Sequence, residues 1–175
     1  GVELDGYQFY CEVTETGTCS VSSNAAQVSV QSTTWNGSVW SNGAPTLSSI
    51  VVLNGNYNTI ANGDLLACSL TVNATYNLIV ENNTYVQVQS DVVVEGNITV
   101  ETQGSFVQID DTSTFTLNGS GTSSVNKTTS FLNHWYDYTH WSSPVVDDTV
   151  ESALSLAPAS RRFYFEAANF EDILI

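Results

Sequence analysis

Short runs in which apolar and polar residues alternate dominate the middle of the chain. Alternation over four to eight residues is typical of half-buried strands, whereas helical spacing occurs only once, at residues 149–157. Strand-like triplets begin at Ile50, Leu70, Leu78, Val86, Val92, Ile98, Phe106 and Phe115. The pattern therefore predicts an all-β protein.

These triplets recur with a period that spans three strands. Val92 follows Leu70 by 22 positions, and Phe115 follows Val92 by 23. The same strands end in a polar residue and then a small one, at Asn54-Gly55, Asn73-Ala74, Glu95-Gly96 and Asn118-Gly119. Such periods indicate a solenoid, and three short strands per coil predict a short three-sided parallel β-helix.

In this β-helix every second residue of a strand faces the interior. The alternative is an antiparallel β-sandwich, because Asn-Gly pairs favour hairpins. A sandwich does not predict that corners recur with every third strand, so we favour the solenoid. The predicted core residues are Leu70, Val72, Leu78, Val80, Val86, Val88, Val92, Val94, Ile98, Val100 and Phe106.

The chain is predicted to have three segments, with boundaries at 1–31, 32–130 and 131–175. The first has two alternating runs, at 7–13 and 25–30, and the second is the solenoid. Stacked coils leave backbone groups and core side chains open at each end. We therefore expect the aromatic residues of 131–145 to form a cap, followed by a strand at 161–167.

The first segment resembles the last hairpin of a bacterial immunoglobulin-like domain. The resemblance lies in Asp5-Gly6-Tyr7-x-Phe9-x-Cys11 and in residues 23–30. Phe9 stands where the family often has its corner tyrosine, so that hydrogen bond is missing. The earlier strands of such a domain are absent, which implies that the chain is an excerpt of a larger protein.

Composition and charge argue against several classes of function. Three basic against 18 acidic residues give a net charge of -15, which argues against nucleic-acid binding and against anionic membrane surfaces. No apolar run approaches the roughly 20 residues of a membrane span. Hydrophobic residues reach 42% but charged residues only 12%, which indicates a secreted or cell-surface β protein.

Two motifs resemble modules of large secreted proteins of the Bacteroidetes, especially flavobacteria. They are Thr34-Trp35-Asn36-Gly37-Ser38-Val39-Trp40-Ser41-Asn42-Gly43-Ala44-Pro45 and Tyr138-Thr139-His140-Trp141-Ser142-Ser143-Pro144-Val145. The resemblance covers about residues 32–170. It implies export by the type IX secretion machinery and an extracellular or outer-surface location.

Such proteins include adhesins, gliding-motility proteins and polysaccharide-degrading enzymes with accessory modules. We therefore predict a non-enzymatic structural or adhesive segment, which would present binding modules and could contact surface glycans. The alternative is a carbohydrate-binding accessory module.

Four tryptophans are candidates for glycan stacking. Trp35, Trp40, Trp135 and Trp141 could offer aromatic faces to sugar rings. They flank the predicted coils, however, and this placement favours the interpretation that they seal the solenoid ends.

No cofactor is predicted, although two acidic pairs are candidates for Ca²⁺. Asp110-Asp111 and Asp147-Asp148 lack the spaced acidic pattern of a known calcium loop, so solvated turns are favoured. Glu81, Glu95 and Glu101 either line one solenoid face or act as solubilising surface residues.

Catalytic residues are not predicted either. His134 and His140 are near Ser142-Ser143, but no Gly-x-Ser-x-Gly turn surrounds a serine. No local pattern places two carboxylates across a groove, as a glycosidase requires.

Cysteines and modification motifs complete the candidate chemistry. Cys11 either bridges the predicted hairpin to Cys19 or pairs outside the chain, and Cys68 is predicted to be a buried, inert thiol. Asp148-Thr149-Val150 resembles the Bacteroidetes O-glycosylation pattern, so Thr149 is a candidate acceptor. Six asparagine sequons are incidental if the bacterial resemblance holds.

Overall fold

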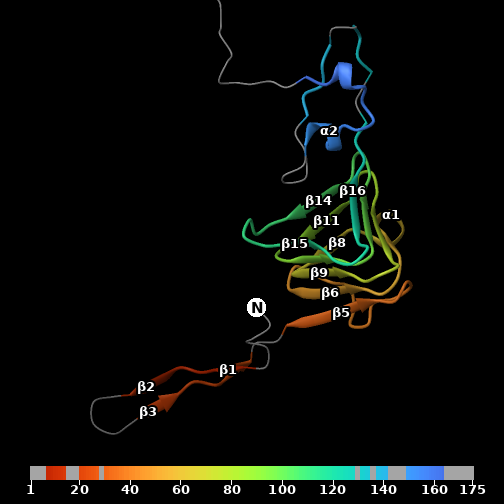
Figure 1. Cartoon of the computed structure of the whole chain (residues 1–175). Coiled ribbons are helices and arrows are strands. Elements are labelled where there is room, and N and C mark those ends of the chain that lie inside the picture. The colour runs from red at the N-terminus through yellow and green to blue at the C-terminus, as the bar shows by residue number, and fades with distance from the viewer. Residues whose placement is uncertain are drawn as a thin grey trace, which may run out of the picture. The chain divides into compact units, whose positions relative to one another are not determined.

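The computed structural model describes residues 7–14, 20–27, 30–128, 131–134, 137–141 and 149–163. The chain forms two compact units, Gly1–Thr128 and Thr129–Ile175 (Figure 1). The strands of the first unit are β1 (Gln8–Phe9), β2 (Glu12–Thr14), β3 (Ser20–Ser22), β4 (Ala26–Gln27), β5 (Gln31–Trp35), β6 (Ser49–Leu53), β7 (Tyr57–Asn58), β8 (Leu65–Ala67), β9 (Ser69–Val72), β10 (Asn77–Val80), β11 (Tyr85–Val88), β12 (Val92–Val94), β13 (Asn97–Val100), β14 (Ser105–Gln108), β15 (Phe115–Leu117) and β16 (Thr122–Val125).

Strands β5 to β16 wind into a parallel solenoid of about four turns. Within the described residues they form three sheets, with strand orders β16-β13-β10-β7, β14-β11-β8 and β15-β12-β9-β6-β5. One coil is β9, β10 and β11, and the next is β12, β13 and β14, so each coil adds one strand to every sheet. In Figure 1, β5, β6 and β9 lie one above another as successive rungs.

The register of the coils matches the period of the sequence. Leu70 pairs with Val92, and Val92 pairs with Phe115, in parallel ladders. On the other two sheets, Leu78 pairs with Ile98, and Val86 with Phe106. The predicted parallel β-helix is confirmed, and the antiparallel sandwich is wrong for this region.

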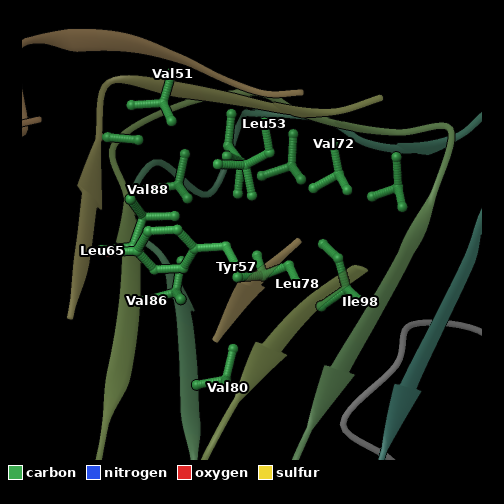
Figure 2. Close-up of a cluster of buried hydrophobic side chains, with 14 of the residues drawn as sticks. Val51, Leu53, Tyr57, Leu65, Val72, Leu78, Val80, Val86, Val88 and Ile98 are labelled. Atoms are coloured by element: carbon green, nitrogen blue, oxygen red, sulfur yellow. The ribbon is translucent and has the colours of Figure 1, made fainter. Parts of the chain in front are cut away.

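The interior is filled by the alternate residues of each strand. Ten of the predicted core side chains are buried, and the eleventh, Phe106, is partly buried against them. Figure 2 shows Val51, Leu53 and Val72 pointing from one sheet toward Tyr57 and Leu78 of another. Burying apolar side chains contributes about 25 cal/mol per Å² of area removed from water, so this interior is the main source of stability.

Glycine is required where one coil turns closely over the next. A Cβ atom on Gly96 would lie 2.2 Å from the carbonyl oxygen of Tyr76, and one on Gly121 would lie 2.1 Å from that of Val94. The polar-then-small corners found in the sequence therefore have a steric cause at Gly96. A side chain there would push two coils apart.

The first coil carries a short helix that the sequence analysis missed. Helix α1 (Thr59–Asn62) begins after Asn58, whose side-chain oxygen accepts hydrogen bonds from the backbone N–H groups of Ile60 and Ala61. Gly63 ends it with a φ of 94°. Strands β7 and β8, beside it, were also missed, because β7 has only two residues and the Leu-Leu-Ala sequence of β8 does not alternate between apolar and polar residues.

The strands before the solenoid form antiparallel pairs. β1 pairs with β4, and β2 pairs with β3. The predicted pairing of the runs at 7–13 and 25–30 is present in β1 and β4. Residues 15–19, between β2 and β3, lie outside the described residues, and the immunoglobulin-like origin of this segment stays a prediction.

The second unit contains two short helices in its described residues. α2 (Val150–Ala153) lies within the predicted helical run 149–157, and a 3₁₀ helix spans Ala159–Arg161. The predicted strand at 161–167 is therefore wrong at Arg161, where the backbone turns instead. Residues 164–167 lie outside the described part of the chain.

Candidate functional site

The N-terminal end of the solenoid is closed by an aromatic cluster of Trp35, Trp40 and Tyr57. The Trp35 ring centroid lies 5.2 Å from that of Trp40 and 5.2 Å from that of Tyr57, and the Trp40 and Tyr57 centroids are 5.6 Å apart. The indole N–H of Trp35 donates to the carbonyl oxygen of Asn56 at 3.0 Å. Aromatic pairs at these separations add to the stabilisation from burial.

The outer edge of β5 is covered as well, by residues 40–43, which we call the N-terminal lid. The backbone N–H of Ser41 donates to the carbonyl oxygen of Thr34 at 2.9 Å. The side-chain amide of Asn42 donates to the carbonyl oxygen of Ser32 at 2.6 Å. Because the lid satisfies backbone groups along β5, this end offers little free edge for another strand.

The N-terminal lid and the aromatic cluster show that Trp35 and Trp40 have a structural role. Trp35 is only 5% exposed, so neither face of its indole is available to a sugar ring. A glycan-stacking role for Trp35 is therefore wrong. Trp40 is partly buried and packs against Trp35 and Tyr57. Both residues seal the end of the core, as their position in the sequence indicates.

The other two candidate tryptophans belong to the second unit. Trp141 is 40% exposed, and Trp135 lies outside the described residues. Within the first unit, the structure brings the candidate tryptophans Trp35 and Trp40 together.

An amide ladder, defined as Asn56, Asn77, Asn97 and Thr122, runs along the outside of the sheet formed by β7, β10, β13 and β16. The Asn77 amide donates to Asn56 Oδ1 at 3.2 Å, and the Asn97 amide donates to Asn77 Oδ1 at 2.8 Å. The Thr122 hydroxyl donates to Asn97 Oδ1 at 2.6 Å. The ladder adds a side-chain hydrogen bond at each step between coils, and the spacing of these asparagines could have revealed it.

A second column on the same side holds two of the candidate acids. Glu81 and Glu101 follow the paired residues Val80 and Val100, so they lie one coil apart. Glu81 accepts a hydrogen bond from the Asn58 amide at 2.8 Å, and Glu101 accepts from the Asn126 amide at 3.2 Å. Amide donors thus occupy both carboxylates. Glu95 belongs to a different column because it follows Val94 on β12.

Glu95 instead lines a shallow hollow at another corner of the solenoid. This hollow has a volume of about 210 Å³, and it is lined by Ala74, Glu95, Asn118, Gly119 and Ser120.

The Asp110 carboxylate accepts hydrogen bonds within the turn in which it lies. Its Oδ1 accepts hydrogen bonds from the Thr112 hydroxyl at 2.7 Å and from the Thr112 backbone N–H at 2.9 Å, and these bonds lower the pKa of the Asp110 carboxyl. Asp91 accepts hydrogen bonds from the next coil. The Thr114 backbone N–H donates to its Oδ1 at 2.8 Å and the Thr114 hydroxyl at 3.0 Å, and these bonds lower the pKa of the Asp91 carboxyl.

The other candidate acidic pair, Asp147-Asp148, lies outside the described residues. Where the structure is described, no three His, Cys, Asp or Glu side chains gather as a metal site.

The histidines are on the surface of the second unit. His134 Nδ1 lies 3.5 Å from Asp137 Oδ2, and that oxygen also accepts the His134 backbone N–H at 2.8 Å. The pair is local to one turn. His140 is exposed, and Ser142-Ser143 lies outside the described residues.

Thr149 caps helix α2. Its hydroxyl oxygen accepts a hydrogen bond from the backbone N–H of Ser152 at 3.2 Å, and its side chain is exposed. The predicted O-glycosylation at Thr149 stays a prediction.

The cysteines show no bridge among the described residues. Cys11 carries a free, exposed thiol, and Ser23 lies opposite it, donating its backbone N–H to the Cys11 carbonyl at 2.8 Å. Its predicted partner Cys19 lies outside the described residues. Cys68 is a free thiol that is partly rather than fully buried.

The C-terminal end of the solenoid differs from the N-terminal end. We call it the open end: the outer edges of β14, β15 and β16 and the inward side chains Phe106, Phe115, Leu117 and Val125. Phe115 is 41% exposed and Leu117 52%, although their counterparts Val92 and Val94 in the preceding coil are fully buried. The register places Phe115 and Leu117 in the inward columns of Val92 and Val94, but they are much less buried.

Comparisons with known proteins bear on the family alone. None of the helices in the described ranges is long and apolar enough to cross a membrane. No curated protein and no solved structure matches the chain. Residues 25–173 match a family described as a domain of unknown function, DUF8693, and the chain therefore belongs to this family.

Proposed function

We propose that this domain is a non-enzymatic structural segment of a large secreted or cell-surface protein, in which it holds adhesive modules away from their attachment point. The observation that carries the proposal is the continuous stack of coils. Buried apolar columns run through the interior, and the amide ladder runs along one sheet. A body held together at every rung resists bending and stretching along its axis.

The charge of the chain also suits an exposed spacer. A net charge of -15 keeps like molecules apart in solution, and short hydroxyl and amide side chains make up much of its surface. The motifs around Trp35 and Trp141 support a protein exported by the type IX secretion machinery to the outer cell surface. Surface labelling of intact producing cells with an antibody against residues 30–128 tests the location, and labelling only after lysis would contradict it.

Forced unfolding of single molecules tests the mechanical role. The solenoid is pulled between handles placed before Gln31 and after Thr128. We expect one cooperative rupture that releases roughly 30 nm of chain, because about 95 residues extend by about 3.6 Å each. A gradual extension at low force would contradict a stiff spacer.

A pair of asparagine variants makes the test specific to the ladder. Asn97→Ala removes two side-chain bonds between coils and should lower the rupture force. Asn118→Ala is the matched control, because Asn118 is exposed and no side-chain hydrogen bond links it to another coil. Equal forces for the two variants would show that the ladder does not bear load.

A carbohydrate-binding role is the competing proposal. It needs exposed aromatic faces, and the burial of Trp35 leaves Trp141, which is 40% exposed, as a described candidate tryptophan with an accessible side chain. A glycan array separates the two: specific binding that is lost in Trp141→Ala but kept in Trp35→Phe would favour the binding module. A spacer should bind none of the glycans.

A further inference from the structure

The turns of the first unit contain several asparagines that are followed directly by glycine. In such a pair the backbone nitrogen of the glycine can attack the side-chain carbonyl carbon of the asparagine, because glycine has no side chain to hinder the approach. The asparagine side chain must first rotate toward its own backbone, so a fold that holds the side chain prevents the reaction. The pairs are Asn36-Gly37, Asn42-Gly43, Asn54-Gly55, Asn62-Gly63 and Asn118-Gly119.

Hydrogen bonds hold the side chains of the first two asparagines. Asn36 Oδ1 accepts from the backbone N–H groups of Ser38 and Val39, both at 3.0 Å. The Asn42 amide donates to the carbonyl oxygen of Ser32 at 2.6 Å, as part of the N-terminal lid. Rotation of either side chain toward the next residue would break these bonds.

The next two asparagines are held as well. Asn54 Oδ1 accepts a hydrogen bond from the Asn73 amide of the following coil. The Asn62 amide donates to the carbonyl oxygen of Asn58 at 3.1 Å. The nitrogen that would attack Asn62 is also occupied, because the Gly63 N–H donates to a carbonyl oxygen of helix α1 at 2.9 Å.

Asn118 differs from these four in its side chain and in its neighbour. Among the described residues, none forms a hydrogen bond with the Asn118 side-chain amide or with the Gly119 backbone N–H. A Cβ atom built on Gly119 would have no atom within 4 Å. Asn118, Gly119 and Ser120 also line the hollow of about 210 Å³ described above, so there is room for water beside the two reacting groups.

We propose that Asn118 is a site of spontaneous deamidation, a modification that requires water and no enzyme. The Gly119 nitrogen gives its proton to hydroxide and bonds to the side-chain carbonyl carbon of Asn118, which closes a succinimide ring and releases the side-chain nitrogen as ammonia. Water then opens the ring at either carbonyl carbon and leaves aspartate or isoaspartate. The overall reaction consumes one water and releases one ammonia, with no oxidation or reduction.

The corner that contains Asn118 is fitted closely to the coil below it. The Asn118 N–H donates to the carbonyl oxygen of Val94 at 2.8 Å, and the Asn118 carbonyl oxygen accepts from the Gly121 N–H at 2.9 Å. Isoaspartate adds a methylene group to the main chain at this corner. Both products also place a carboxylate in the hollow that Glu95 lines, and like charges repel. Deamidation should therefore loosen strand β16, which follows the corner.

Incubation of the whole chain in mildly alkaline water enriched in heavy oxygen tests the site. Cleavage after glutamate and lysine separates residues 102–127, which contain Asn118, from 16–81, which contain the other four pairs. Mass spectrometry should find label at Asn118 at least about tenfold faster than at the other four, since each of those must first break a hydrogen bond. The same chain in urea should lose this preference. Equal rates in the folded chain, or an unchanged preference in urea, would overturn the proposal.

Hydrogen exchange at the Thr122 amide tests the loosening of β16. This amide donates to the carbonyl oxygen of Gly96 at 2.9 Å, and its protection should fall in the isoaspartate fraction. Asn118→Asp adds the charge without the methylene group and should show a smaller fall. Asn118→Gln is the control, because its longer side chain closes a ring slowly and should keep both mass and protection through the incubation. Full protection in the isoaspartate fraction would contradict the loosening. The inference rests on the fold of the first unit and not on the proposed spacer role.

Discussion

The two ends of the solenoid solve the problem of ending a stack in different ways. At the N-terminal end, Trp35, Trp40 and Tyr57 plug the interior while residues 40–43 cover the edge of β5. At the C-terminal end, Phe115 and Leu117 continue the inward columns of Val92 and Val94 but remain about half exposed. A closed end needs a plug and an edge cover together, and the first end has both.

The difference in burial between the two ends shows how much of each coil's stability comes from the neighbouring coils. Val94 lies between two coils and is fully buried, whereas Leu117, one coil later in the same column, has a coil on one side. The same inward position therefore stabilises the fold to different extents. Substitutions along one column, and at the two ends, measure how the contribution of an inward residue to stability changes from coil to coil.

The largest effect is expected in the middle of the column. Val94→Asp buries an unpaired charge and should lower the free energy of unfolding by about 4 kcal/mol or more. Urea denaturation measures the loss. Val93→Asp is the matched control because Val93 points outward from the same strand, and it should cost much less. Similar losses in both variants would contradict the assignment of inward and outward faces.

The next effect compares the two ends. Trp35→Ala removes the plug and should lower the free energy of unfolding by about 3 kcal/mol, within the usual range for large core aromatics. Phe115→Ala at the open end should cost about 1 kcal/mol, because the ring is already 41% exposed. A loss at Phe115 as large as that at Trp35 would show that the ends do not differ as described.

The smallest expected effects are changes in stability with pH. The N-terminal end should lose stability at high pH, and the open end should lose it at low pH. Burial, with a smaller contribution from Asp64, raises the pKa of Tyr57 to about 12. Since the ordinary value is about 10, the stability from the neutral phenol is complete below pH ~10 and is lost as pH rises through ~12. The pH at which the protein unfolds in alkali, followed by circular dichroism, should change in Tyr57→Phe. An unchanged unfolding pH would contradict the proposal that ionisation of Tyr57 destabilises the fold.

The open end should respond to acid instead. Hydrogen bonds from Thr114 lower the pKa of Asp91 and tie the last coil to the one before it. Their contribution is present above the ordinary pKa of about 4 and is lost as pH falls through the lowered value. The protection factor of the Thr114 amide, which is corrected for the pH dependence of intrinsic exchange, should fall less between pH 6 and 3 in Asp91→Asn than in the wild type. An identical fall in both proteins would exclude Asp91 as the cause.

The repeat and the core could be predicted from the sequence because each carries a periodic signal. Leu70, Val92 and Phe115 recur at a spacing that only a stack of coils explains, and their alternation marks the inward face. Helix α1 and strand β8 could not be predicted, since α1 is a single turn and the Leu-Leu-Ala sequence of β8 does not alternate between apolar and polar residues. The role of Trp35 followed from its position beside the coils, but the lid did not. It depends on the Asn42 side chain reaching back to Ser32, a contact without periodicity.

The N-terminal lid also has a consequence for the order in which this domain takes shape. Every contact that closes the first end joins residues within 31–57, which leave the ribosome before the later coils exist. A nascent chain can therefore complete its starting rung early, through contacts of short sequence separation. We therefore expect each later coil to add to a surface that is already formed, with assembly proceeding in the direction of synthesis.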